Sequence, residues 1–391
     1  MIPFTHLAPL LWQAQLSPPD TGGLNPIVSI LAFLVMLVIL VFVHELGHLL
    51  AALKVGIRAE EFGIGYPPRM FTLFEHDGVK YTMNWLPLGG FVKFAGEGDD
   101  GVYGTGSLAE APPWRKIPVM LAGPLMNLFL AILIFAFIFS INGYPVPTGQ
   151  NIAVIFPGTP AEAAGFREGD ILISLNNASV TGPNDIIQIA RANNGIPIEA
   201  VVLRAGERVE LTVTPGPWTA ILEDGTTQSM NAGIGFSYSP EVEIVEMNPL
   251  AATWTAVTHT VMLVGAMLNG LGQLIGGLFG VTEAPPGGVT GPIGIARATG
   301  EVIDSGGMLA FWNWTAILSI NLFLLNLLPI PALDGSHIMF SLIEWVRGKK
   351  VPPEREAIIH GIGFATLMGL ILLVTIGDVM NAINGVPVLG R

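Results

Sequence analysis

The sequence predicts a polytopic α-helical membrane protein with about four spanning helices, a membrane-associated β-hairpin loop and one inserted α+β domain. Composition is the first reason. Of the 391 residues, 51% are hydrophobic and only 12% are charged, whereas a soluble domain has about 25% charged residues. The formal net charge of -13 argues against a nucleic-acid partner, since binding phosphate needs clustered Lys and Arg. Cysteine is absent, so disulfides and thiolate chemistry are excluded.

The apolar residues are gathered into uncharged runs of spanning length, which is the second reason. Runs of about 20 apolar residues are typical of helices that cross a bilayer. Four such runs are Ile27–Val43, whose pattern continues to Leu53, Ile117–Ile141, Met308–Leu333 and Ala357–Ile376. A fifth run, Leu250–Thr282, also lacks acids and bases, but six glycines interrupt it. It could span, re-enter or lie on the membrane surface.

Basic residues predict the orientation. Lys and Arg gather in segments 54–116 and 347–355 and are absent from residues 1–26. Because basic loops stay in the cytoplasm, the tail 1–26 and the segment that follows the second span are expected outside. If the fifth run crossed, the third span would be inverted. Segment 250–308 is therefore expected to form interfacial or re-entrant helices, and 309–391 to hold the last two spans.

A β-loop is expected in segment 59–94, between the first two spans. Gly78–Phe94 alternates like a hairpin, with Asp77-Gly78 as a turn signal before it. Gly89 and Gly90 break its later half. The loop is too apolar to be free in the cytoplasm, so we expect it at the membrane. It could pack on the protein's own helices, or it could offer an edge strand to an extended partner.

Segment 148–240 predicts an extracytoplasmic α+β domain. Its expected elements are strands at Ile152–Phe156, Asp170–Leu175, Glu199–Leu203, Arg208–Thr214 and Gly233–Tyr238, and a helix at Pro183–Arg191.

The stretch Pro157–Asn177 of this domain resembles a PDZ domain of the bacterial, permuted kind. Such a domain would bind an extended peptide or a C-terminus by adding a strand. Gly233, Ile234, Gly235 and Phe236 are the candidates for its peptide groove. The alternative is a small β-rich domain that serves packing only.

The candidate catalytic and metal-binding residues lie in the first span, where His44 to His48 read H-E-L-G-H. Residues four apart share one face of a helix, so both histidines can bind one Zn²⁺. Glu45 can then take a proton from an attacking water. Ionisable residues in a span are costly unless they are paired or functional. The alternative is a polar structural cluster.

Asp334 is the candidate third ligand, because a catalytic zinc has three protein ligands. The first and third spans both run inward, so Asp334 and His44 lie at similar depth. His337, three residues later, is a rival ligand if the helix resumes there.

Two prolines at the end of the third span, Pro329 and Pro331, interrupt the helix at membrane depth. Irregular backbone is tolerated there only where it is buried or lines a cavity. Asn326 lies nearby. It could hydrogen-bond a substrate backbone or an oxyanion, or it could satisfy the broken helix.

Three motifs together resemble the site-2 protease family of intramembrane zinc metalloproteases. They are the H-E-x-x-H of the first span, G-P-L-M-N at Gly123–Asn127, and N-x-x-P-x-P-x-L-D-G at Asn326–Gly335. The single PDZ-like insert is closest to the RseP-type members, and Val289–Ala296 resembles that group too. Gly123, Pro124 and Asn127 are expected to serve helix packing.

The resemblance implies a zinc protease of a bacterial inner membrane that cuts within the transmembrane helix of single-span proteins. An anti-sigma factor or a remnant signal peptide would be the substrate. His44, His48 and Asp334 would bind zinc, Glu45 would be the general base, and Asn326 would contact the substrate. Ser336 stands where the family often has a second glycine, and RseP itself has two PDZ domains.

Two other classes of function remain as alternatives. One is a non-catalytic membrane scaffold with a structural metal site, but such a site needs no base like Glu45. The other is a metal-ion transporter, because His and Asp inside a membrane also mark ion pathways. Transporters commonly show internal repeats, and this sequence has none.

Overall fold

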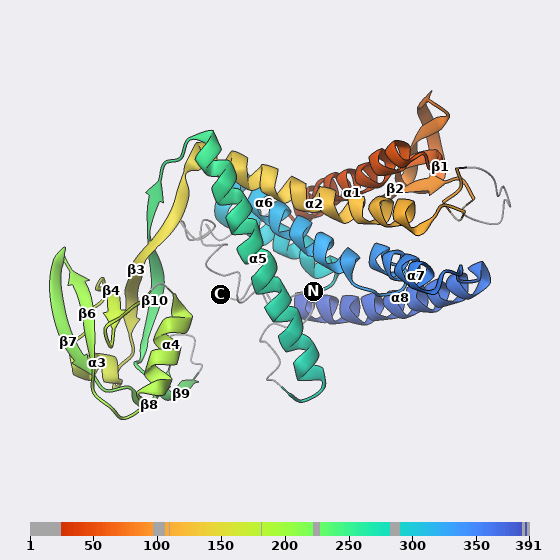
Figure 1. The fold of residues 1–391 in the computed structure, drawn as a ribbon. Coiled ribbons are helices and arrows are strands. Elements are labelled where there is room, and N and C mark those ends of the chain that lie inside the picture. Colours follow the sequence, from red (N-terminus) through yellow and green to blue (C-terminus); the bar gives the residue numbers. More distant parts are fainter. Residues whose placement is uncertain are drawn as a thin grey trace. The chain divides into compact units, whose positions relative to one another are not determined.

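The computed structural model describes residues 25–96, 106–108, 110–180, 182–221, 227–281, 290–384 and 388, so the expected tail 1–26 lies outside it except for its last two residues. The chain forms two compact units, one of residues 141–248 and one of the remainder. The helices of the larger unit are α1 (Pro26–Val55), α2 (Pro113–Asn142), α5 (Pro249–Leu278), α6 (Pro292–Leu327), α7 (Asp334–Arg347) and α8 (Pro353–Ile383) (Figure 1).

Five of these helices are long and apolar enough to cross a membrane: α1, α2, α5, α6 and α8. This is one more than the four counted from the sequence. The additional helix, α5, runs unbroken through its glycines. A helical glycine costs only about 0.5–1 kcal/mol relative to alanine, which is too little to interrupt a run of 30 residues. Its interfacial or re-entrant placement remains a prediction.

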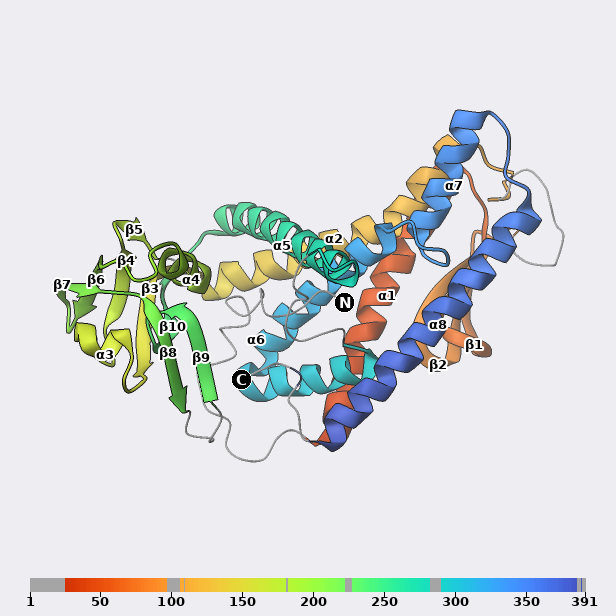
Figure 2. The same cartoon turned by 90° about the horizontal axis from the view of Figure 1, so that it is seen from below.

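The third expected span differs at both ends. Helix α6 begins at Pro292, bends at Gly307 (φ 62°, ψ -148°) and ends at Leu327, six residues before the predicted end (Figure 2). It ends early because Pro329 and Pro331 disfavour helical conformation in the residues before them. Of the most apolar stretch of α6, 72% is buried, so α6 is the central helix of this unit.

The N-terminus of α6 is held by a distant carboxylate. Among the described residues, no side chain of its own segment caps it. Asp378 of α8 instead accepts hydrogen bonds from the backbone N–H groups of Gly291 (3.3 Å) and Gly294 (2.8 Å). A Cβ at Gly294 would lie 2.9 Å from Asp378 Oδ1. The expected motif Val289–Ala296 thus contains the N-terminus of α6, whose backbone N–H groups bind a buried carboxylate. Val289 itself lies outside the described residues.

A small sheet follows α1. It consists of β1 (Ala59–His76) and β2 (Val79–Phe94), which pair antiparallel. The turn between them is at Asp77 (φ 51°) and Gly78 (φ 78°), where the sequence predicts it. Positive φ at both positions is typical of a type I′ hairpin turn, which favours Asp-Gly.

Both strands of this sheet fold back, so that they form four segments. Glu61 pairs with Lys80 on one side and with Lys93 on the other. The segment around Glu61 therefore lies inside the sheet. Residues 69–76 form one edge and residues 90–94 form the other.

The unit of residues 141–248 is an α+β domain. Its strands are β3 (Tyr144–Ile155), β4 (Ile171–Leu175), β5 (Ala178–Ser179), β6 (Ile198–Arg204), β7 (Glu207–Val213), β8 (Gly216–Ile221), β9 (Thr227–Gly233) and β10 (Phe236–Val245), and its helices are α3 (Pro160–Ala164) and α4 (Pro183–Ala192). The main sheet has the order β10-β3-β4-β6-β7, with β5 paired to β4, and β8 and β9 form a separate hairpin. Ile152, Leu172, Leu175 and Val202 are fully buried in its core.

The prediction of one strand in this domain is wrong. Gly233–Tyr238 is not continuous, because β9 ends at Gly233 and β10 begins at Phe236. Gly235 between them has φ 90°, which is incompatible with an extended chain. The carbonyl of Gly235 accepts hydrogen bonds from Phe156 N (3.1 Å) and Thr159 Oγ1 (3.0 Å).

Candidate metal centre

Three side chains meet between α1 and the start of α7. His44 and His48 lie one turn apart on α1, and Asp334 is the first residue of α7. Asp334 Oδ2 lies 3.0 Å from His44 Nε2 and 3.3 Å from His48 Nε2. The two Nε2 atoms are 3.1 Å apart. Both histidines are buried, so three donor atoms converge on one point inside the protein.

This arrangement fits a zinc ion. Asp334 Oδ2 is buried and makes no well-formed hydrogen bond with any described residue, so its charge calls for a cation. Two imidazole nitrogens and one carboxylate oxygen are the ligands of many catalytic zinc sites, which leave a fourth position for water or substrate. The three residues predicted from the sequence as ligands are therefore brought together.

Each histidine is oriented through its second ring nitrogen. His48 Nδ1 lies 2.8 Å from the carbonyl oxygen of Val119 in α2. A carbonyl can only accept, so Nδ1 carries the proton and Nε2 keeps the lone pair that a metal needs. The backbone of α2 thereby fixes both the tautomer and the ring plane of His48.

Asn127 of α2 does the same for His44. Its amide nitrogen Nδ2 lies 3.2 Å from His44 Nδ1, and its Oδ1 has no hydrogen-bond partner among the described residues. When His44 Nε2 binds a metal, Nδ1 must donate a proton. The amide then presents Oδ1 to the ring, because a half-turn of an asparagine amide exchanges its oxygen and nitrogen. Ser319 Oγ of α6 donates to the backbone carbonyl of Asn127 (2.7 Å) and so helps to hold it.

Gly123 provides the space that His48 occupies. A Cβ at this position would overlap the His48 ring at Nε2. The sequence analysis assigned Gly123 and Asn127 to helix packing only, and in the structure they also position the ligands. Their spacing of four residues puts both on one face of α2, which is the signal that could have identified them.

Glu45 lies next to His44 on α1 and is also close to the small sheet. A Cβ at Gly90 would lie 3.5 Å from Glu45 Cγ, and the carboxylate faces the backbone of Val92. A small pocket is lined by Val38, Phe42, Glu45, Phe62, Gly63, Ile64, Gly89 and Gly90. The predicted residues Glu45, Gly89 and Gly90 therefore share one pocket at the edge formed by residues 90–94.

The remaining predicted residues lie elsewhere. Asn326 is half-buried in the last turn of α6, and none of the described hydrogen bonds joins it to the ligands. His337, the rival ligand, lies with Glu356 of α8 (3.3 Å) instead. In the inserted domain, the Ile234 and Phe236 side chains are 3% and 7% exposed. They belong to its core, and their backbone already pairs within the domain, since Ala161 N donates to Ile234 O (2.7 Å) and Phe236 pairs with Ile155.

The chain is similar to known proteins over most of its length. The family model described as Peptidase family M50 matches residues 32–370. The zinc metalloprotease RasP of Geobacillus kaustophilus is 34% identical, over 90% of this chain and 98% of the relative. The regulator of sigma-W protease RasP of Bacillus subtilis is 30% identical, over 90% and 98%. The matched residues include the three that converge at the buried site.

Proposed function

The chain belongs to peptidase family M50, the site-2 protease family of intramembrane zinc metalloproteases, and from this membership we propose that it hydrolyses a peptide bond within the transmembrane helix of single-span membrane proteins. An enzyme of this family is neither a scaffold nor an ion transporter. The observation that carries the proposal is the convergence of His44, His48 and Asp334 in a multi-pass protein, with Glu45 beside them.

His44, His48 and Asp334 would hold the zinc ion. When bound, zinc polarises the scissile carbonyl and lowers the pKa of a water molecule toward about 7. Glu45 would take the proton of the attacking water and return it to the leaving amine. Val119 and Asn127 would keep the lone pairs of the histidines directed at the ion.

Residues 90–94 would receive the substrate as an added strand. The backbone amides of a helix are already hydrogen-bonded, so a transmembrane substrate must unwind before it can be cut. An edge strand offers new partners to the freed amides, and this edge lies against Glu45. Gly89 and Gly90 would let the substrate backbone approach closely. Asn326 would hydrogen-bond the substrate near the scissile bond.

One face of this sheet already packs on the helices, as the sequence analysis allowed. Phe62, Val92 and Phe94 belong to a buried cluster with Leu49 of α1 and Val119 of α2. This packing uses side chains that point out of the sheet plane. It does not use the backbone of the edge, of which Val92 faces Glu45, so both roles are compatible.

The sequence also suggests the type of membrane, the orientation of the chain and the class of substrate. We propose a bacterial inner membrane, with the basic segments in the cytoplasm, the inserted domain outside and segment 250–308 at the membrane interface or re-entrant. The inserted domain would be PDZ-like and bind a peptide or C-terminus at residues 233–236. The relative from Bacillus subtilis is named as a regulator of sigma-W protease, which supports an anti-sigma factor as substrate. A remnant signal peptide is the other candidate.

The test compares purified wild type with Glu45→Gln in detergent, using a single-span model substrate and a zinc assay on both proteins. We expect wild type to cut within the span, and the variant to keep its zinc and lose cleavage. Equal cleavage by both proteins would remove Glu45 as the base. No cleavage by either, with one zinc in each, would count against the proposed substrate class.

A further inference from the structure

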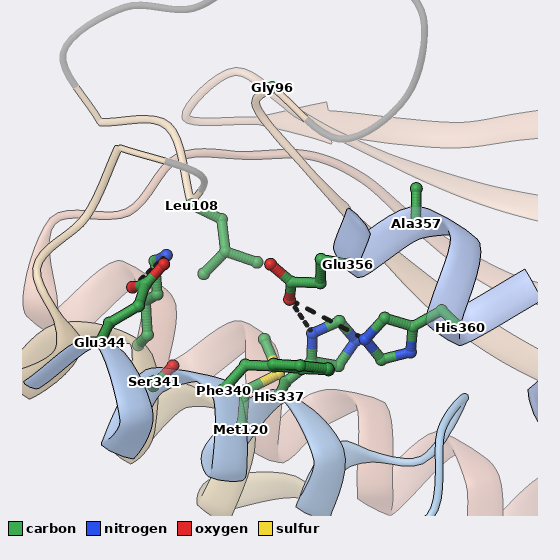
Figure 3. A pocket seen from close by; sticks show the side chains of 11 residues that line it. Gly96, Leu108, Met120, His337, Phe340, Ser341, Glu344, Glu356, Ala357 and His360 are labelled. Atoms are coloured by element: carbon green, nitrogen blue, oxygen red, sulfur yellow. Dashed lines mark hydrogen bonds and ion pairs between the residues drawn. The ribbon is translucent and has the colours of Figure 1, made fainter. Parts of the chain in front are cut away.

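A second group of metal-binding side chains lies between α7 and α8. His337 Nδ1 is 3.3 Å from Glu356 Oε1, and His360 Nε2 is 3.8 Å from the same oxygen. The two imidazole rings stack with centroids 4.2 Å apart. Figure 3 shows all three side chains converging on one wall of a cavity of about 410 Å³. None of the three belongs to the catalytic ligand set.

The chemistry of this group suits a transition-metal ion. One donor atom from each residue lies within 4.8 Å of the others, which is close enough to bind one ion after small side-chain movements. Two imidazoles with a carboxylate suit Zn²⁺ and its neighbours in the first transition series. His360 Nε2 is buried and has no hydrogen-bond partner among the described residues. The cavity gives an ion and its water ligands a route to the site.

The nearby charges leave Glu356 available for a cation. Lys116 also lines the cavity, but its Nζ lies 3.2 Å from Glu344 Oε2. Glu344 is itself buried, so this pair largely compensates its own charge. The described side chains in direct contact with the Glu356 carboxylate are therefore the two histidines.

His360 also links this group to the catalytic centre. Its Nδ1 accepts a hydrogen bond from the backbone N–H of Ala332 (3.0 Å). Ala332 lies two residues before Asp334 and has φ 76°, a conformation that is unfavourable for alanine. Because Nδ1 accepts here, the proton of the neutral ring must be on Nε2.

Metal binding and this hydrogen bond exclude one another. A metal on Nε2 takes its lone pair, so the proton of a neutral ring moves from Nε2 to Nδ1. Two N–H groups would then face each other at Ala332. The hydrogen bond is lost, and the turn that precedes Asp334 loses a contact that holds its strained conformation.

We propose that His337, Glu356 and His360 form a second binding site for a divalent transition-metal ion, and that its occupancy slows proteolysis by releasing the turn before Asp334. The metal-binding half of this inference stands on its own geometry. The inhibitory half rests on the proposed function.

The experiment counts bound zinc in purified full-length protein by equilibrium dialysis against buffered free Zn²⁺. Wild type should bind a first equivalent tightly and a second one at higher free zinc. His337→Gln and Glu356→Gln should lose the second equivalent and keep the first. His76→Gln is the matched control, since His76 is an exposed histidine (72%) at the end of β1, and it should still bind two. One equivalent in wild type, or loss of the second in the control, would overturn the site.

Hydrogen exchange and cleavage then test the link to Asp334. When the second equivalent binds wild type, amide exchange in residues 328–336 should speed up and cleavage should fall at least about tenfold. His337→Gln should show neither change at the same free zinc. Inhibition of both proteins to the same extent, or unchanged exchange in wild type, would overturn the coupling. If no sample cuts the substrate, the proposed function fails, while the zinc count and the exchange still decide this inference.

Discussion

At the scale of single residues, Asn127 and Gly123 act on the metal centre without touching the metal. Asn127 lies 3.2 Å from the nitrogen of His44 that faces away from Asp334, and Gly123 leaves room for the His48 ring. Both belong to α2, whereas the histidines belong to α1. The precision of the centre therefore depends on how closely these two helices pack.

Replacing Asn127 by leucine should weaken zinc binding by about 10–100-fold, the usual effect of losing a hydrogen-bond partner of a metal-binding histidine. The physical reason is that His44 Nδ1 would lose its acceptor. Competition with a chelator measures the affinity. Asn127→Asp is the control, since it keeps an oxygen beside the ring and should bind zinc nearly as well as wild type. Unchanged affinity in Asn127→Leu would contradict the role of this side chain.

Replacing Gly123 by alanine should displace His48 and reduce both zinc content and cleavage. The added methyl group would occupy the space of the imidazole, and a packed interior does not yield easily. Zinc per chain and cleavage rate are the measurements. Gly265→Ala is the matched control, because a Cβ there would meet no described atom within 4 Å. The same loss in both variants would show a general effect of the substitution.

At the scale of elements, the start of α6 depends on α8. The four first N–H groups of a helix have no partner within it, and Asp378 satisfies two of them at α6. The acid is buried and its charge lies at the positive end of the helix dipole. The C-terminal apolar helix thereby fixes the central helix that leads to Asp334.

Asp378→Ala should therefore lower the stability of the helical unit by about 1–2 kcal/mol, the range measured for loss of a capping side chain. Thermal unfolding in detergent would show this as a lower midpoint. Gly377→Ala, next to it on α8 and without a close neighbour, should leave the midpoint nearly unchanged. An unaltered midpoint in Asp378→Ala would mean that water replaces the carboxylate as a cap.

The two edges of the small sheet make the substrate-pairing proposal testable. The chain has no cysteine, so a single introduced thiol reports its own contacts. In a Glu45→Gln background, Lys93→Cys on the edge at residues 90–94 should form a disulfide with a substrate that carries one cysteine near the scissile bond. Leu73→Cys, on the opposite edge, is the control and should not. Equal crosslinking at both edges would count against pairing at residues 90–94.

At the scale of the whole molecule, the chain forms two compact units. The unit of residues 141–248 has its own buried core. It also has a bidentate ion pair, in which Arg204 donates to both carboxylate oxygens of Asp170 at 2.8 Å. These hydrogen bonds raise the pKa of the Arg204 guanidinium. Asp170 is 1% exposed, and the backbone N–H of Arg167 also donates to its Oδ2 (2.8 Å).

This unit should therefore fold when it is expressed alone. We expect residues 141–248 to be soluble and to unfold cooperatively in urea. Asp170→Ala should cost about 1.5–3 kcal/mol, the usual contribution of hydrogen bonds to a charged group, because the Arg204 guanidinium left behind is partly exposed. Glu210→Ala, which removes an exposed acid of β7, is the control and should change stability little. A non-cooperative transition of the isolated unit would show that its fold needs the membrane unit.

Local patterns predicted much of the site. The four-residue spacing of His44 and His48 is a property of any helix, the Asp77-Gly78 turn depends on two neighbouring φ angles, and a span is recognisable from composition alone. The convergence with Asp334 was predicted from orientation alone. Apart from that convergence, which joins distant segments, these features can be recognised without knowledge of the fold, because each is determined by interactions within a few residues of the chain.

The contacts between distant segments became visible only in the tertiary structure. The sequence alone left Asp334 and His337 as rivals, and their positions relative to α1 and α8 separate them. Asn127 meets His44 across 83 residues, and Gly291 meets Asp378 across 87. Gly235 breaks an expected strand in a turn that contacts residues 156–161. Such contacts depend on the packing of whole helices and sheets. A local pattern, such as the spacing of Gly123 and Asn127, can mark one face of a helix, but it does not give the partner of that face.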